Sequence, residues 1–179
     1  LRALTLKFQH LNMFTEKEIK SFGNYIAKTN LESFFLDFSE YTALTDDSVE
    51  GITHWIMPLT PLRRLKLSFS SCKHLTDVGL AHIKNALKPI KFLNSLELDL
   101  SACTKISDRG LHVIYEGMKS LTSLKEWILD LSFCTQITND ALSSLKEYLR
   151  LLPLEVLFLG LVKCEKINEK GLAHIKEVM

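Results

Sequence analysis

Six copies of one pattern of apolar and polar positions run through the chain. The copies are 30 or 31 residues long and begin at Leu1, Leu31, Leu62, Leu93, Leu124 and Leu154. Within each copy, positions 4, 6 and 8 are apolar and alternate with mostly polar residues, as Leu96, Leu98 and Leu100 do. A period of two is typical of a half-buried β-strand. The pattern therefore predicts one strand in each copy, for example over residues 96–100.

The second part of each copy predicts a helix with a capped start. Position 15 holds a residue type that is favoured as a helix N-cap, namely Thr15, Thr45, Thr76, Ser107, Thr138 and Asn168. Position 16 is mostly acidic, which suits the positive end of a helix dipole. Apolar residues then follow at positions 19, 22 and 26, such as Leu111, Ile114 and Met118. This spacing forms one buried stripe on a helix, so each copy is a strand, a tight turn, a capped helix and a return loop.

One copy cannot bury both its strand face and its helix stripe alone. Stacking the copies buries these surfaces against each other. We therefore expect an α/β solenoid, with residues 1–179 as a single domain of six coils. Its parallel sheet should be concave and its helices convex, because a helix is about 10 Å wide whereas strands lie about 4.8 Å apart.

The repeats also resemble a known family. Residues 93–111, LNSLELDLSACTKISDRGL, are similar to the cysteine-containing leucine-rich repeat of ribonuclease-inhibitor-like proteins and F-box adaptors, and the same signature recurs at 62–80, 124–142 and 154–172. The cysteine stands at position 11, two places later than in that class, which lengthens the strand side by about 6–7 Å. This long variant resembles repeats of large protist proteins. The resemblance implies a horseshoe fold and a role in protein–protein interaction.

The four cysteines invite a metal or disulfide interpretation. Cys72, Cys103, Cys134 and Cys164 are one repeat apart, so each lies on its own coil in a row with steps of about 5 Å. A metal site needs ligands around one point, so we predict buried, reduced thiols. The sequence also contains no Ser/His/Asp set, glycine-rich phosphate loop or His-Glu-x-x-His run. We expect neither enzyme activity nor a cofactor.

Charge narrows the range of partners. With 22 basic and 21 acidic residues the net charge is +1, whereas surfaces for nucleic acid or anionic lipid need a basic field. An RNA-binding patch around Arg63, Arg64 and Lys66 stays open as an alternative. No apolar run approaches the roughly 20 residues that span a bilayer, and no leader peptide is recognisable. We expect a cytoplasmic protein within a cytoskeletal or other large complex.

The outward strand positions are the candidate partner-binding site. They form three zones: a basic zone in the third repeat, an acidic zone in the fourth and fifth, and an apolar zone in the sixth. The candidates are Phe35, Asp37, Arg64, Lys66, Glu97, Asp99, Ile128, Asp130, Val156 and Phe158. The charges are either a solvated sheet face or groups that set the register of a protein partner anchored on the apolar zone.

The sequence thus predicts a non-enzymatic interaction scaffold. Two alternatives are the substrate-recognition arm of an F-box ubiquitin ligase and a regulatory repeat domain attached to an enzyme such as a kinase. The first and last repeats lack polar caps. We therefore expect an excerpt of a longer chain, whose ends are covered by further repeats or neighbouring subunits.

Overall fold

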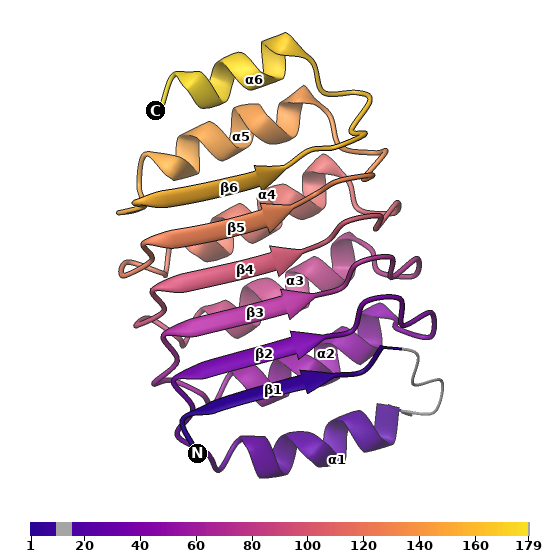
Figure 1. The fold of residues 1–179 in the computed structure, drawn as a ribbon, viewed down its shortest axis with the longest axis vertical. Coiled ribbons are helices and arrows are strands. Elements are labelled where there is room, and N and C mark those ends of the chain that lie inside the picture. Colours follow the sequence, from indigo (N-terminus) through magenta and orange to yellow (C-terminus); the bar gives the residue numbers. More distant parts are fainter. Residues whose placement is uncertain (10–15, 179) are drawn as a thin grey trace.

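Strands and helices alternate along the chain, as the repeat predicts (Figure 1). The computed structural model describes residues 1–9 and 16–178. The strands are β1 (Ala3–Lys7), β2 (Ser33–Asp37), β3 (Arg64–Ser68), β4 (Ser95–Asp99), β5 (Glu126–Asp130) and β6 (Val156–Gly160). The helices are α1 (Glu16–Ile26), α2 (Asp46–Ile56), α3 (Asp77–Leu87), α4 (Asp108–Met118), α5 (Asn139–Leu149) and α6 (Glu169–Lys176). Each repeat forms one coil, and we number these coil 1 to coil 6 in chain order.

The strands form one parallel sheet in chain order, β1 to β6. Neighbouring strands pair without any shift in register, so that Leu65 of β3 lies opposite Leu96 of β4 and Leu96 lies opposite Trp127 of β5. All the helices lie on one side of this sheet (Figure 1). Every repeat position therefore becomes a row that crosses the whole stack, and the predicted architecture is confirmed.

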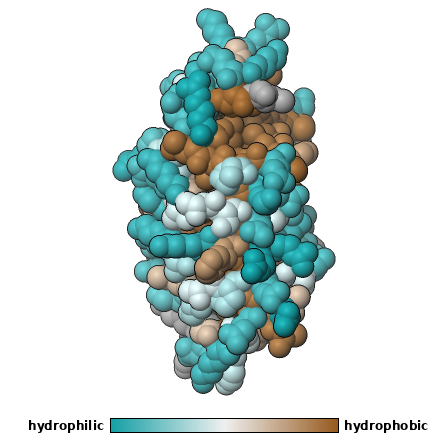
Figure 2. Space-filling view, turned by 90° about the vertical axis from the view of Figure 1, so that its left-hand side faces the viewer, coloured by the Kyte–Doolittle hydropathy of each residue, from teal (hydrophilic) through white to brown (hydrophobic). Residues whose placement is uncertain are grey.

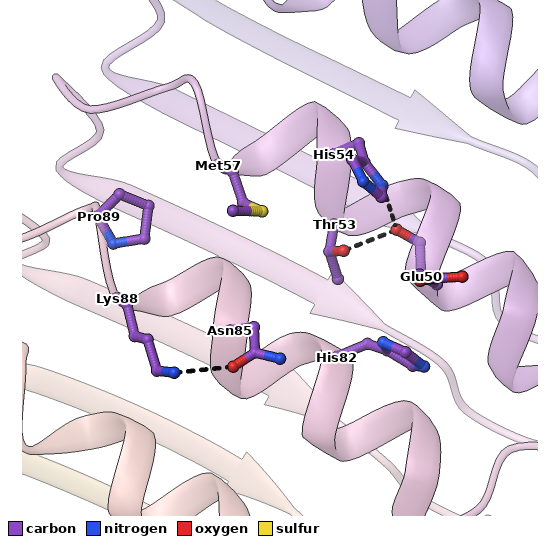
Figure 3. Close-up of a pocket in the computed structure, with 8 residues that line it drawn as sticks. All are labelled: Glu50, Thr53, His54, Met57, His82, Asn85, Lys88 and Pro89. Atoms are coloured by element: carbon purple, nitrogen blue, oxygen red, sulfur yellow. Dashed lines mark hydrogen bonds between the residues drawn. The ribbon is translucent and has the colours of Figure 1, made fainter.

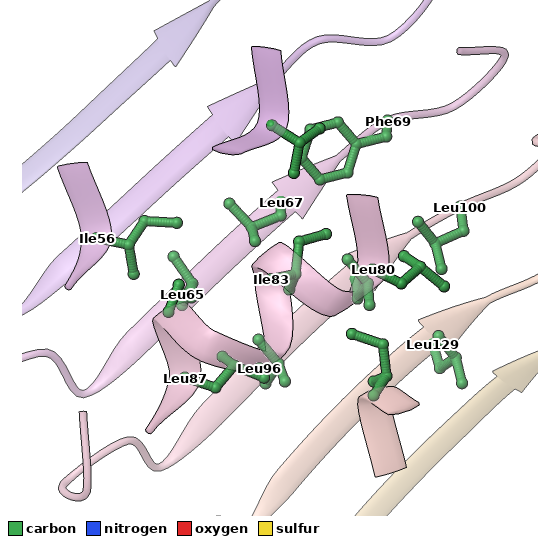
Figure 4. Close-up of a cluster of buried hydrophobic side chains, with 14 of the residues drawn as sticks. Ile56, Leu65, Leu67, Phe69, Leu80, Ile83, Leu87, Leu96, Leu100 and Leu129 are labelled. Carbon is green, nitrogen blue, oxygen red and sulfur yellow. The ribbon is translucent and has the colours of Figure 1, made fainter. Parts of the chain in front are cut away.

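The core lies between the sheet and the helices. The inward leucines Leu67 and Leu98 are 1% exposed, and Ile83 and Leu87 on the helix stripe are 2% and 0% exposed. Figure 4 shows Leu65 and Leu67 of β3 beside Ile83 and Leu87 of α3. Burying such side chains stabilises the fold by about 1.5–3 kcal/mol each. Neighbouring coils share this one interior.

The helix caps follow the sequence prediction in coils 2 to 6. Thr45, Thr76, Ser107, Thr138 and Asn168 have extended backbone, and their side chains accept hydrogen bonds from first-turn amides. In coil 2 the cap is reciprocal, because Ser48 in turn accepts from the Thr45 amide at 3.3 Å. The predicted cap at Thr15, the apolar positions Leu11 and Phe14, and Met179 lie outside the described residues.

The acids that follow the caps link one coil to the next, which the sequence analysis missed. Asp77 accepts hydrogen bonds from the backbone amide of Ser107 at 2.9 Å and from its hydroxyl at 2.6 Å. Asp46 accepts in the same way from Thr76, and Asp108 from Thr138. The carboxylates thus form a polar row between coils in addition to complementing the helix dipoles.

A glycine makes room for this row. A Cβ on Gly110 would lie 2.2 Å from a carboxylate oxygen of Asp77. The equivalent Gly79 donates its amide to Asp46 at 3.0 Å. The close approach of acid and backbone therefore explains why glycine recurs at this position.

The cysteines form a second row, which is buried. Each thiol donates a hydrogen bond to a carbonyl of the preceding coil: Cys72 to Phe38 at 3.2 Å, and Cys103 to Phe69, Cys134 to Leu100 and Cys164 to Leu131 at 3.1 Å each. All four are free thiols. Burial raises the pKa of Cys72 and of Cys134 to about 12. The row is a packing and hydrogen-bonding element of the coil stack.

Replacing Asp77 by alanine should destabilise the protein by about 2–4 kcal/mol, because two donors on Ser107 lose a charged acceptor. Urea unfolding measures the loss. Asp47→Ala is the matched control, since Asp47 is an exposed acid in the first turn of α2 and its removal should cost under about 1 kcal/mol. Equal losses in the two variants would contradict the inter-coil role of Asp77.

The raised thiol pKa values predict a loss of stability at high pH. The protonated thiols contribute fully below the unfolded-state pKa of about 8.5, and this stability is lost as pH rises toward the folded-state value of about 12. Between pH 8 and pH 10, Cys72 and Cys134 should each contribute about 1–2 kcal/mol to the decline. Urea unfolding of a Cys72→Ala, Cys134→Ala variant should therefore show a shallower pH dependence than the wild type. Identical slopes would refute this assignment.

Candidate functional site

The predicted site residues lie together on the open face of the sheet. Unshifted pairing aligns position 5 of successive coils, so Phe35, Lys66, Glu97, Ile128 and Phe158 form one row. Asp37, Asp99 and Asp130 lie in the row of position 7, and Arg64 and Val156 lie in the row of position 3. All ten candidates thus occupy one continuous surface, which places them without assigning them a role.

The basic and acidic zones are joined by an ion pair. Lys66 Nζ lies 2.5 Å from Glu97 Oε1, and the two side chains are 40% and 29% exposed. Beside them, Arg64 Nε donates to Ser33 Oγ at 2.9 Å. The charges that the sequence analysis assigned to separate zones are therefore partly neutralised against each other, which weakens the field that a nucleic acid would require.

The aspartates of the face also have a structural task. Asp37, Asp99 and Asp130 accept hydrogen bonds from the backbone amide two residues further on, at 3.0, 3.0 and 2.8 Å. Such Asx turns stabilise a change of chain direction, and here they end the strands. The carboxylates are thereby held at fixed places along the edge where the chain leaves the sheet.

Asp99 and Asp130 are neighbours in register, yet their carboxylates turn away from each other. Asp99 accepts a hydrogen bond from Ser68 of the preceding coil at 2.8 Å. Asp130 leans the other way over β6, where a Cβ on Gly160 would lie 2.4 Å from its Oδ1. The absence of a side chain at Gly160 therefore lets two like charges on adjacent strands avoid direct opposition.

Apolar side chains gather at the coil 6 end of the face. Val156 and Phe158 are 50% and 53% exposed, and Ile128 pairs in register with Phe158. Figure 2 shows apolar surface concentrated toward this end on the side where the strands begin, whereas hydrophilic surface dominates the earlier coils. The predicted apolar zone is therefore accessible for contact.

Val162 belongs to the apolar zone that the sequence predicts for the sixth repeat, whereas Phe133 beside it was missed. Phe133 and Val162 are 50% and 62% exposed. Phe133 has a positive φ of 63°, as do Glu40, Ser71, Ala102 and Lys163 at the same repeat position. Left-handed backbone costs a bulky residue about 1–2 kcal/mol. The signal in the sequence was an aromatic residue at a position that is polar or small in other coils.

The helical face carries a shallow groove between α2 and α3 (Figure 3). It encloses about 570 Å³ and is lined by Glu50, Thr53, His54, Met57, His82, Asn85, Lys88 and Pro89. Thr53 and His54 bond to the carbonyl of Glu50 at 2.7 and 2.9 Å, and Lys88 bonds to Asn85 at 2.9 Å. These polar groups are engaged within their own helices and do not converge on the groove.

The described part of the chain offers no metal-binding cluster, because nowhere in it do three His, Cys, Asp or Glu side chains come together. Within residues 1–9 and 16–178, no helix has the length and apolar character needed to cross a membrane. The sheet face presents carboxylates, the Lys66–Glu97 ion pair and an apolar end.

Comparison with known proteins supports the fold. No protein family and no curated protein matches the sequence. The structure is similar to the tropomodulin C-terminal domain of Caenorhabditis elegans, with a TM-score of 0.61 and 9% identity over 90% of each chain. It is also similar to leiomodin-1 actin-binding site 2, with a TM-score of 0.59 and 14% identity over 91% of this chain and 84% of that one.

The chain is a leucine-rich-repeat solenoid. At identities this low the similarity concerns the fold and carries no site residue across. In this leucine-rich-repeat solenoid the sheet face is the concave side and the helices are the convex side, as the sequence predicts.

Neutralising the Lys66–Glu97 pair should cost little stability, because both side chains are partly exposed. A double-mutant cycle with Lys66→Met and Glu97→Gln should give a coupling energy of about 0.2–1 kcal/mol that shrinks in high salt. Urea unfolding at low and high salt measures it. A coupling above about 2 kcal/mol would show that the pair is a main support of the sheet.

Proposed function

We propose that this chain is a non-enzymatic scaffold that binds a protein partner on its sheet face, inside the cell. The observation that carries the proposal is the continuous surface formed by the ten candidates, which runs from charged coils 3 to 5 to the half-exposed apolar end on coil 6. Protein interfaces combine an apolar patch with charged groups beside it.

The arrangement of the carboxylates favours binding over catalysis. Asp37, Asp99 and Asp130 accept hydrogen bonds from backbone amides, and Glu97 pairs with Lys66. Groups held in this way present fixed charges to a partner. A general acid or base would instead need a carboxylate poised over a reacting atom.

Actin is the first partner to test. The similar solved segment of leiomodin-1 is an actin-binding site, and a filament-associated role would agree with the large intracellular complex that we expect. An F-box ligase arm or a regulator of an attached kinase would use the same face, and no observation here favours either. The row of buried thiols supports placing the repeats in the cysteine-containing subclass.

Replacing Ile128 and Phe158 together by serine should weaken partner binding at least about tenfold, because the apolar contact area is lost. Purified monomeric and filamentous actin serve as the first ligands. A photo-crosslinking residue at position 35 or 128 of the full chain, used in cells, identifies any other direct partner for the same affinity measurement. Unchanged affinity for the identified partner would exclude the sheet face.

Asn85 provides the matched control position. It lies on the helical face, in the groove between α2 and α3, so a crosslinker at position 85 should not capture the same partner. Capture from position 85 but not from positions 35 or 128 would place the interface on the convex side and overturn the proposal. Thermal unfolding confirms that the serine variant remains folded.

A further inference from the structure

A shallow cavity, open to solvent, lies at the rim of the sheet where coils 3 to 6 leave their strands. It encloses about 520 Å³, and the lining residues that matter here are Ser70, Ser101, Asp130, Ser132, Phe133 and Val162. A carboxylate, hydroxyl oxygens and an aromatic ring thus converge on one hollow.

The carboxylate of Asp130 in this cavity can accept further hydrogen bonds. Asp99, one coil earlier, accepts hydrogen bonds from Ser68 and from the hydroxyl and amide of Ser101. Asp130 accepts from the amide of Ser132 through Oδ1, and within residues 1–9 and 16–178 its Oδ2 has no hydrogen-bond partner. Gly160 leaves the space over β6 into which this carboxylate leans. Asp130 therefore keeps one carboxylate oxygen for a further donor, whereas both oxygens of its neighbour Asp99 are engaged.

Backbone hydrogen bonds fix the turn that carries Phe133, which lines the same cavity as Asp130. Phe133 donates its amide to the carbonyl of Val162 at 2.7 Å, and Val162 donates its amide to Ser132 Oγ at 3.3 Å. These bonds fix the rim of coil 5 on coil 6. The equivalent position accepts Glu40, Ser71, Ala102 and Lys163 in other coils, so the stacking does not require a phenylalanine. An exposed ring at this place is free to serve a contact.

A cation matches this set of groups better than an anion or an apolar group. A planar guanidinium can stack on an aromatic face while it donates to a carboxylate and to hydroxyl oxygens. The adjoining surface is apolar, because Val162 and Phe158 are more than half exposed, at 62% and 53%. The charge and the shape of the rim thus favour a partner that presents a basic side chain with an apolar neighbour.

We propose that the rim cavity at Asp130 and Phe133 binds an arginine of the protein partner, and that an apolar residue next to this arginine packs on Val162 and Phe158. This inference rests on the proposed function and names the partner chemistry that one end of the face selects. The guanidinium contacts the Phe133 ring and Asp130 Oδ2. Coils 3 and 4 then contact the rest of the partner.

The test uses the full chain and a capped nine-residue Gly/Ser peptide with Arg-Leu at its centre. Amide resonances are followed by NMR during titration. Saturable shifts should centre on Asp130, Ser132, Phe133 and Val162, with a Kd on the order of 1 mM that rises with salt. A peptide with citrulline in place of arginine should bind at least about tenfold more weakly, because it lacks the charge.

Variants locate the contact. Asp130→Asn keeps an acceptor for the Ser132 amide but removes the charge, and Phe133→Ala introduces the residue that coil 4 carries as Ala102. Each should weaken the Arg-Leu peptide about five- to tenfold. Asp140→Asn is the matched control, because Asp140 is an exposed acid of the same coil that lies in the first turn of α5 on the helical side. It should change the Kd less than about twofold.

Several outcomes would overturn the inference. These are equal binding of the citrulline peptide, equal effects of Asp140→Asn and Asp130→Asn, shifts centred elsewhere, and no saturable shift up to about 10 mM peptide. Concentration-dependent shifts of the same amides without peptide would show that a second copy occupies the rim instead. If the peptide does not bind but position 128 still crosslinks to the partner, only the inference about the rim cavity is wrong. If crosslinking fails, the proposed function is wrong.

Discussion

The structure depends on the unshifted pairing of each strand with the next. Because Leu65, Leu96 and Trp127 lie opposite one another, every repeat position becomes a row, and each row repeats one kind of contact. Inward positions supply the shared apolar core, thiols donate to carbonyls, and helix-start acids accept from the following cap. A slip of one residue would move the core leucines to the solvent face and break the polar rows together.

The sequence predicted those features that arise inside a single coil. Alternation located the strands, and the residue types at position 15 located the helix starts, because local backbone preferences decide both. The same reasoning predicted the row of cysteines, since their spacing equals the repeat. Contacts between coils were harder to foresee. That Asp77 bonds to Ser107 depends on how far two helix starts are separated in space, which no local propensity encodes.

The candidate site shows the same contrast between features that the sequence predicts and contacts between coils that it does not. Its residues could be named from the sequence, because outward strand positions follow from the period of two. Their partners could not: Lys66 reaches Glu97, and Asp99 and Asp130 turn in opposite directions. Phe133 was missed because its exposure results from a left-handed turn that follows the strand. The sequence therefore indicates which residues face outward, whereas their side-chain partners emerge only from the structure.

The constant register has an evolutionary consequence for recognition. Each outward side chain lies on its own coil beside its equivalents on the adjacent coils, while the core beneath it is built from other positions. A substitution at an outward position that makes no structural hydrogen bond thus alters a segment of the bound surface of about 5 Å and leaves the scaffold intact. Evolution can therefore change the binding preference of such a surface one coil at a time, through sequences that all still fold.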